Sequence, residues 1–166
     1  MVRQTPAMAS LAETAPVFVE MAHRIVWATA ATVDDQGRPW SRVLHPLWSW
    51  DGRSLTGIVA TSPLSPKRRQ LDAHPYVSFT YWHPNHDTCT AQCRATWDLS
   101  EEGRLAGWEA FATAPPPVGF DPAIVAGWET PLSPTFGILH LEPWRLQVLP
   151  GSVMLGGAGE VLVWQA

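Results

Sequence analysis

The stretch Ser65-Pro66-Lys67-Arg68-Arg69-Gln70-Leu71-Asp72-Ala73-His74-Pro75 is the key to how this chain folds, and it is typical of a short helix. Ser65 is a good N-cap, Pro66 suits the first helical position, and His74-Pro75 ends the pattern. Three cations, among them the only lysine of the chain, then lie in the first turn, where the helix dipole disfavours positive charge. Free N–H groups and cations at one helix start favour a bound anion, most naturally a phosphate. The alternative is a basic turn that faces solvent.

Composition predicts one folded domain over residues 1–166, with a flexible lead-in at residues 1–9. Of the 166 residues, 46% are hydrophobic and only 16% are charged, which argues against disorder. The net charge of −4 argues against a general nucleic-acid binder. Ten tryptophans are many for this length, and Trp suits cores, interfaces and ligand walls. We therefore expect some of them at the surface of the monomer, covered by a second subunit or by a flat aromatic ligand.

The sequence indicates a cytoplasmic protein that is not embedded in a membrane. It has no run of 18 apolar residues, and its N-terminus lacks the pattern of a signal peptide. The two cysteines, Cys89 and Cys93, suit a reducing compartment. On one strand their Cα atoms would be about 13 Å apart, which is too far for a disulfide.

The clearest pattern is the alternation of residues 88–99, in which Thr, Gln, Arg and Asp side chains share one face and Cys, Ala, Trp and Leu side chains the other. A period of two over this length predicts a half-buried antiparallel strand. The remaining expected strands are 25–33, 39–50, 54–61, 76–83 and 135–149, the last disturbed at Pro143. Residues 153–155 and 160–164 form either a final hairpin or an arm around the glycine-rich segment 156–159. Helices are expected at 10–24, where Ser10 and Glu13 form a capping box, at 65–75, at 100–112 and near 123–128. The fold class is therefore mainly β: a meander of antiparallel strands that forms a small closed or partly closed barrel, with short helices.

Two runs of the sequence carry a family resemblance. They are Thr29–Val33 with Gly37–Leu44, and Ser65–Ser78, in which a Ser-x-Lys-x-Arg-x-Leu helix is followed by His-Pro and a strand. Together they resemble the pyridoxamine 5'-phosphate oxidase-like superfamily, the FMN-binding split barrels of antiparallel Greek-key type, over about residues 20–150. The Pro-Pro-Val-Gly-Phe-Asp-Pro loop and the strand Leu141–Leu146 look like the flavin/deazaflavin oxidoreductase branch of that superfamily.

The resemblance implies a set of cofactor-binding residues. Arg42 matches a phosphate-binding arginine of the second strand, and Lys67 matches the lysine at the helix start that contacts the phosphate. The implied contacts are Arg42, Val43, Leu44, Thr61, Ser62, Lys67, Arg69 and Thr88, with Thr61 and Ser62 beside the ring or the ribityl chain. The sequence departs from true pyridoxamine phosphate oxidases at Pro66, where they have Arg, and at Thr88, where they have Gln. It also lacks their C-terminal Arg-x-His pattern, so oxidation of vitamin B6 is not implied.

The resemblance implies a flavin-dependent oxidoreductase that binds FMN at the interface of a homodimer and acts on a small-molecule substrate. Three alternatives stay open: a reductase that uses the deazaflavin coenzyme, a non-catalytic flavin- or haem-binding protein, and an interaction domain without a cofactor. The sequence contains no nucleophile elbow, phosphate-loop pattern or dinucleotide fingerprint, and hydride transfer at a flavin requires no acid–base pair in the protein.

A metal site is the rival interpretation of His83-Pro84-Asn85-His86-Asp87 together with Cys89 and Cys93, since His, Asp and Cys are competent ligands. We favour a hairpin turn, with both cysteines on the apolar face of the next strand, and expect no metal. Two further features have two interpretations each. His45 is either a polar residue at the barrel rim or a group that approaches a ring or a haem, and the loop Pro115–Pro122 is either a lid or a stiff surface loop.

Overall fold

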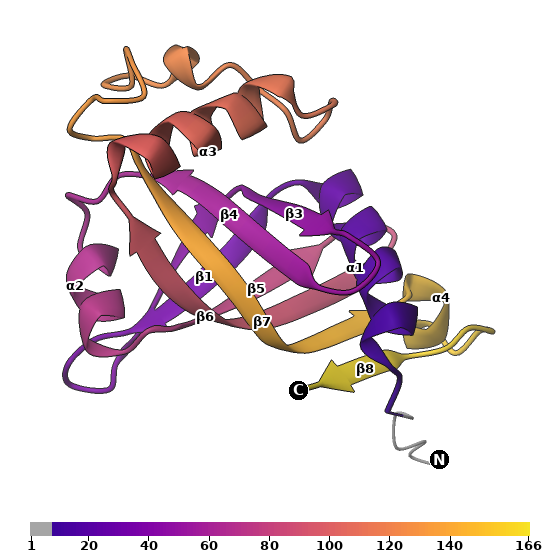
Figure 1. The fold of residues 1–166 in the computed structure, drawn as a ribbon. Helices are drawn as coiled ribbons and strands as arrows, with labels where there is room; N and C mark the ends of the chain where they lie inside the picture. Colours follow the sequence, from indigo (N-terminus) through magenta and orange to yellow (C-terminus); the bar gives the residue numbers. More distant parts are fainter. Residues whose placement is uncertain (1–7) are drawn as a thin grey trace.

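The computed structural model describes residues 8–166, and its strands form one strongly curved antiparallel sheet (Figure 1). The order of its strands is β2-β1-β5-β6-β7-β4-β3, and β8 pairs with β7. The strands are β1 (Ala28–Val33), β2 (Pro39–Leu44), β3 (Pro46–Trp50), β4 (Leu55–Thr61), β5 (Tyr76–Trp82), β6 (Thr88–Asp98), β7 (Gly137–Leu149) and β8 (Leu162–Gln165). The helices are α1 (Leu11–Ile25), α2 (Lys67–Ala73), α3 (Glu101–Thr113), α4 (Gly151–Met154) and the 3₁₀ turn η1 (Pro122–Ile124). The prediction of a mainly antiparallel β fold is confirmed.

The sheet closes on itself at His45. Strands β2 and β3 lie at the two ends of the strand order, yet only His45 separates Leu44 at the end of β2 from Pro46 at the start of β3. The two ends of the sheet must therefore meet there, which makes a barrel. The predicted single strand 39–50 is wrong, because its two halves pair with different partners, β2 with β1 and β3 with β4. The predicted meander of consecutive strands is also wrong, since β4 pairs with β7 and not with β5.

Helix α1 begins as predicted. Ser10 accepts a hydrogen bond from the Glu13 N–H at 3.2 Å, and the Glu13 carboxylate accepts one from the Ser10 N–H at 2.8 Å. Pro16 lies inside the helix without ending it. The buried face of the helix includes Phe18 and Met21, which pack into the barrel, and the backbone N–H of Trp48 donates to His23 Nε2 at 3.0 Å. The helix therefore covers one side of the barrel and is tied to β3.

The long pair β6–β7 confirms the strand predicted from alternation. Cys89, Ala91, Cys93 and Ala95 are buried, and both cysteines are free thiols. The register shifts where Gln92 pairs with Arg145 but Cys93 pairs with Pro143, so β7 carries one extra residue at the predicted disturbance.

The C-terminal prediction is partly wrong. Residues 151–154 form a short helix in place of a strand, and β8 pairs with β7 and not with a hairpin partner. The N-terminal prediction falls mostly on residues 1–7, which lie outside the described residues. Ala9, however, donates its N–H to the Val163 carbonyl at 2.8 Å, so the end of the predicted lead-in is attached to β8.

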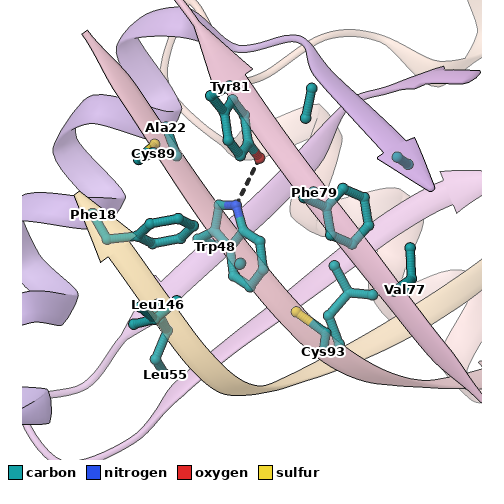
Figure 2. Close-up of a cluster of buried hydrophobic side chains, with 14 of the residues drawn as sticks. Phe18, Ala22, Trp48, Leu55, Val77, Phe79, Tyr81, Cys89, Cys93 and Leu146 are labelled. Atoms are coloured by element: carbon teal, nitrogen blue, oxygen red, sulfur yellow. Dashed lines mark hydrogen bonds between the residues drawn. The ribbon is translucent and has the colours of Figure 1, made fainter. Parts of the chain in front are cut away.

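The barrel interior is packed around Trp48 (Figure 2). The indole of Trp48 is 3% exposed and donates to the hydroxyl of the fully buried Tyr81 at 2.8 Å. Phe18 from α1 packs edge-on against Trp48 with ring centres 5.1 Å apart. Opposite Trp48 on β4 stands Gly57, where an added Cβ would lie 2.7 Å from the indole, so only glycine leaves room for the ring.

Tyr81→Phe is expected to lower the free energy of unfolding by about 1–3 kcal/mol, because it leaves the buried Trp48 N–H without an acceptor. Urea denaturation monitored by tryptophan fluorescence measures the change. Tyr76→Phe is the matched control, since Tyr76 is on the same strand but 57% exposed, and it should change stability by less than about 0.5 kcal/mol. Equal stability of the wild-type protein and Tyr81→Phe would contradict the role assigned to this bond.

Helix α3 and the loop that follows it form a separate layer over one end of the sheet (Figure 1). Trp128 and Phe136 of this loop form a second hydrophobic cluster with Ile138 of β7, and Trp108 and Phe120 pack against it. None of the described helices is both long enough and apolar enough to cross a membrane.

Candidate functional site

The β1–β2 hairpin places Arg42. Its turn is the predicted Asp34–Gly37 segment, in which Gly37 has a φ of 77°. The buried Asp34 carboxylate accepts from the Arg38 N–H at 2.9 Å, from Arg38 Nε at 2.8 Å and from Trp40 Nε1 at 3.0 Å. These bonds hold the pKa of Asp34 far below its usual range. The register that the turn sets pairs Arg42 with Ala30, so the Arg42 side chain shares a face with Ala30 and with Thr32 beyond it.

The basic helix exists, but Ser65 does not cap it. Helix α2 begins at Lys67, with Pro66 at the N-cap position and no capping side chain. The Ser65 hydroxyl instead donates to the Ser62 carbonyl at 2.9 Å and accepts from Lys67 Nζ at 2.5 Å. The preceding turn therefore uses Ser65 to hold the lysine side chain, and it is the side-chain cations rather than a capped helix end that define the site.

Lys67 is a buried cation that pairs with no acidic side chain of residues 8–166. It is 8% exposed, and its ammonium group donates to Ser65 Oγ and, at 3.5 Å, to the Ser62 carbonyl. Burial, and then the positive charge of Arg42, lower the pKa of Lys67 to about 8. At neutral pH the Lys67 ammonium group is still charged in most molecules, although its buried surroundings favour the uncharged amine.

Arg42 is the second cation of the site. Its guanidinium donates from Nη1 to Thr32 Oγ1 at 2.6 Å and from Nη2 to Gln70 Oε1 at 3.0 Å. Gln70 is on α2, one turn after Lys67, so the two side chains share a helix face. Neither Arg42 nor Lys67 forms an ion pair with a carboxylate of residues 8–166. The neighbouring Arg68, by contrast, pairs with Asp72 at 2.8 Å.

The other sequence-predicted residues are distributed unevenly around these two cations. Ser62 contributes its carbonyl to Lys67, and Thr61 is buried at the end of β4 just before it. Arg69 is exposed on α2, Val43 is 61% exposed on the face of β2 opposite to Arg42, and Leu44 packs against the core. Thr88 is not brought to the site within one chain: it pairs with Leu149 at the end of β7, whereas Thr61 pairs with Gly137 at its start.

Thr32 and Gln70 are the site residues that sequence reasoning missed. They are 2% and 4% exposed, and the Thr32 hydroxyl donates to Gln70 Oε1 at 2.6 Å. A signal was available in each case. Thr32 is a polar residue on the inward face of an alternating strand, and Gln70 follows Lys67 by three residues in the predicted helix.

His45, at the closure of the barrel, lies in an aromatic cluster. Its ring stacks on Phe120 at 5.2 Å and is 5.1 Å from Trp27 and 5.8 Å from Phe111. Its Nε2 atom is buried and makes no hydrogen bond to any residue that the structure describes, and burial lowers the pKa of His45. Phe120 belongs to the loop Pro115–Pro122, which therefore packs onto the barrel.

The segment His83–Asp87 is the predicted hairpin turn between β5 and β6. His83 and Asn85 are hydrogen-bonded through their side chains at 2.8 Å, and Asp87 accepts from the Gly151 N–H at 2.7 Å and from Arg24 at 2.7 Å. These side chains are occupied by the turn and by its contacts to α1 and α4.

Solved structures with the same architecture come from several bacteria. An FMN-binding protein related to pyridoxamine 5'-phosphate oxidase from Nostoc punctiforme matches with a TM-score of 0.61 and 20% identity, over 87% of this chain and 85% of that one. The chain has the split-barrel fold. The haem storage protein HutZ from Vibrio cholerae shares this split barrel with a TM-score of 0.58 and 20% identity, over 80% of this chain and 92% of that one. A haem-binding protein from Mycobacterium smegmatis matches with a TM-score of 0.60 and 19% identity, over 96% of this chain and 59% of that one.

The predicted resemblance to the pyridoxamine 5'-phosphate oxidase-like split barrels is thus confirmed at the level of the fold. No protein-family model and no curated protein matches the sequence. Assignment to the deazaflavin branch stays a prediction.

Proposed function

We propose that this split barrel is a flavin-dependent oxidoreductase that binds FMN and holds its phosphate between Arg42 and Lys67. The observation that carries the proposal is the pairing of these two cations with neutral oxygen acceptors only, among residues 8–166. Two neighbouring cations disfavour each other unless an anion lies between them. A phosphate monoester, with close to two negative charges at neutral pH, matches that charge and accepts several charge-assisted hydrogen bonds.

The chain's own residues bind and orient, and the cofactor supplies the redox chemistry. When bound, FMN provides two-electron transfer, which needs no acid–base pair from the protein. Arg42 and Lys67 would fix the phosphate, Arg69 would add a solvent-exposed positive charge, and Thr61 and Ser62 would contact the ribityl chain or the ring. The deazaflavin coenzyme would place its phosphate on the same two cations.

A homodimer is part of the proposal. Tyr76 and Trp82 lie on one face of β5 and are each 57% exposed, and Val43 lies on the same face of the sheet, 61% exposed. This exposed apolar surface suits a second copy of the chain. Thr88 pairs directly with Trp82, so it lies on this face too, and in such a dimer it could contact the cofactor of the partner.

Binding of FMN compared with riboflavin tests the proposal, because riboflavin lacks only the phosphate. We expect FMN to bind at least about 100-fold more tightly, from charge-assisted contacts of about 1.5–3 kcal/mol each, and the protein to sediment as a dimer of its 18.3 kDa chain. A protein that binds neither FMN nor the deazaflavin coenzyme would contradict it.

Haem is the second candidate ligand, and a separate titration with haem tests it. The Nε2 atom of His45, which makes no hydrogen bond within residues 8–166, favours haem, and this fold is shared by a haem-binding protein and a haem storage protein. A haem absorption band that disappears in His45→Ala would replace the flavin proposal. Because Nε2 is buried, haem binding there would require side chains around His45 to move.

A further inference from the structure

The Arg42 guanidinium is part of a closed ring of three hydrogen bonds, and it also donates to the Ala30 carbonyl at 3.4 Å. Arg42 Nη1 donates to Thr32 Oγ1, Thr32 Oγ1 donates to Gln70 Oε1, and Gln70 Oε1 also accepts from Arg42 Nη2, at 2.6, 2.6 and 3.0 Å. The three residues come from β1, β2 and α2, and Thr32 and Gln70 are almost fully buried. Because both partners of Arg42 are buried and bonded to each other, the ring fixes the plane of the guanidinium.

The chemistry of the ring fixes its orientation. An arginine can only donate, so the group of Gln70 that faces Arg42 must be the amide oxygen, and the Thr32 hydroxyl must direct its proton to that oxygen. The Gln70 NH₂ group makes no hydrogen bond within residues 8–166, so it remains able to donate to a ligand.

The ring is also electrically neutral apart from Arg42. A carboxylate is the strongest partner for a guanidinium, but it would cancel the charge that an anion is to meet. A glutamine and a threonine orient the guanidinium and leave that charge intact. Lys67, one turn before Gln70, is likewise held by a hydroxyl and a carbonyl.

We propose that Thr32 and Gln70 are positioning residues that hold Arg42 in place by neutral hydrogen bonds, so that Arg42 and Lys67 together present two uncompensated charges to a phosphate. The proposal rests on the proposed function for the identity of the ligand. The arrangement of Arg42 beside Lys67 can be tested without a ligand.

The first experiment measures FMN and riboflavin binding to Gln70→Glu, Thr32→Val and Thr32→Ser. Gln70→Glu keeps the shape but adds a negative charge, and we expect FMN affinity to fall about 10-fold or more while riboflavin affinity is unchanged. Thr32→Val should lower only FMN affinity, and Thr32→Ser should restore it because it keeps the hydroxyl. A merely structural role would lower the affinity for both ligands equally, which would overturn the proposal.

The second experiment titrates Lys67 in the protein without ligand. Lys67 is the only lysine, so one side-chain resonance of a lysine-labelled sample reports its pKa by NMR. If the ring holds Arg42 beside Lys67, releasing it with Gln70→Leu should raise the Lys67 pKa, as Arg42→Gln should. Gln70→Leu in the Arg42→Gln background should then add no further shift.

The two experiments test the proposed function and the positioning role independently. A wild-type protein that does not bind FMN refutes the proposed function, while the Lys67 titration still decides about the ring. A shift of equal size for Gln70→Leu with and without Arg42, or no shift at all, overturns the positioning role. Thermal melts of each variant identify loss of folding, and the Thr32 pair provides the same test if Gln70→Leu does not fold.

Discussion

The double variant Arg42→Ala with Lys67→Ala is expected to bind FMN about 10²–10⁴-fold more weakly than the wild-type protein, with its riboflavin affinity unchanged. Each cation would make charge-assisted contacts to the phosphate worth about 1.5–3 kcal/mol, so losing both removes about 3–6 kcal/mol of binding free energy. Quenching of flavin fluorescence, titrated at constant ionic strength, measures both affinities. Because riboflavin has no phosphate, its affinity reports only on contacts to the isoalloxazine ring and the ribityl chain.

Arg68→Ala is the matched control for this loss of charge. Arg68 is adjacent to Lys67 in sequence, but it pairs with Asp72 and its guanidinium carbon lies 5.6 Å from the centre of the Trp97 ring. We expect less than a threefold change in FMN affinity, since the charge of Arg68 is already compensated and screened by solvent. If the double variant bound FMN as tightly as Arg68→Ala does, the phosphate would have to lie elsewhere.

The sequence was sufficient where a local pattern determines the structure. The alternation of 88–99 predicted β6, and the capping box of Ser10 and Glu13 predicted the start of α1. The missing N–H of Pro143 predicted a disturbance in β7, which the structure shows as a bulge. Each of these depends on residues close together in the chain. The same holds for the cluster of cations that drew attention to Lys67.

The failures concern partners that are distant in sequence. No local pattern shows that the chain changes pairing partners at His45. The break between β2 and β3 results from the closure of the barrel, while residues 39–50 have the propensity of one continuous strand. The ring of Arg42, Thr32 and Gln70 joins residues up to 38 positions apart. Ser65 has the chemistry of an N-cap, but its hydroxyl bonds to Ser62 and Lys67 instead, because the buried ammonium group of Lys67 needs an acceptor. Site residues that act through a neighbour become visible only once that neighbour is in place.

Replacing Lys67 by methionine is expected to stabilise the protein without ligand while weakening its binding of FMN. The pKa of Lys67 is about 8 in the folded protein, against 10.5 for an unperturbed lysine. At pH 7 the lysine is charged in both states, and keeping it charged in the fold costs on the order of 3 kcal/mol. Methionine keeps the apolar stem and removes the charge, so Lys67→Met should raise the free energy of unfolding by about 1–3 kcal/mol, after the loss of the bond to Ser65.

The stabilisation expected for Lys67→Met depends on pH. Between the folded pKa of about 8 and the unfolded value near 10.5, the unfolded chain holds more protons at this position than the folded one, so wild-type stability should rise with pH in that window. Lys67→Met lacks this rise, and its advantage should be full below pH 8 and vanish above about pH 10.5. Urea denaturation at pH 7, 9 and 10.5 measures it, with Arg68→Met as the exposed control, for which no stabilisation is expected. A less stable Lys67→Met at pH 7 would mean that the ammonium group stabilises the empty site. The opposite effects on stability and binding expected here would show that the fold keeps a destabilising charge because the ligand requires it.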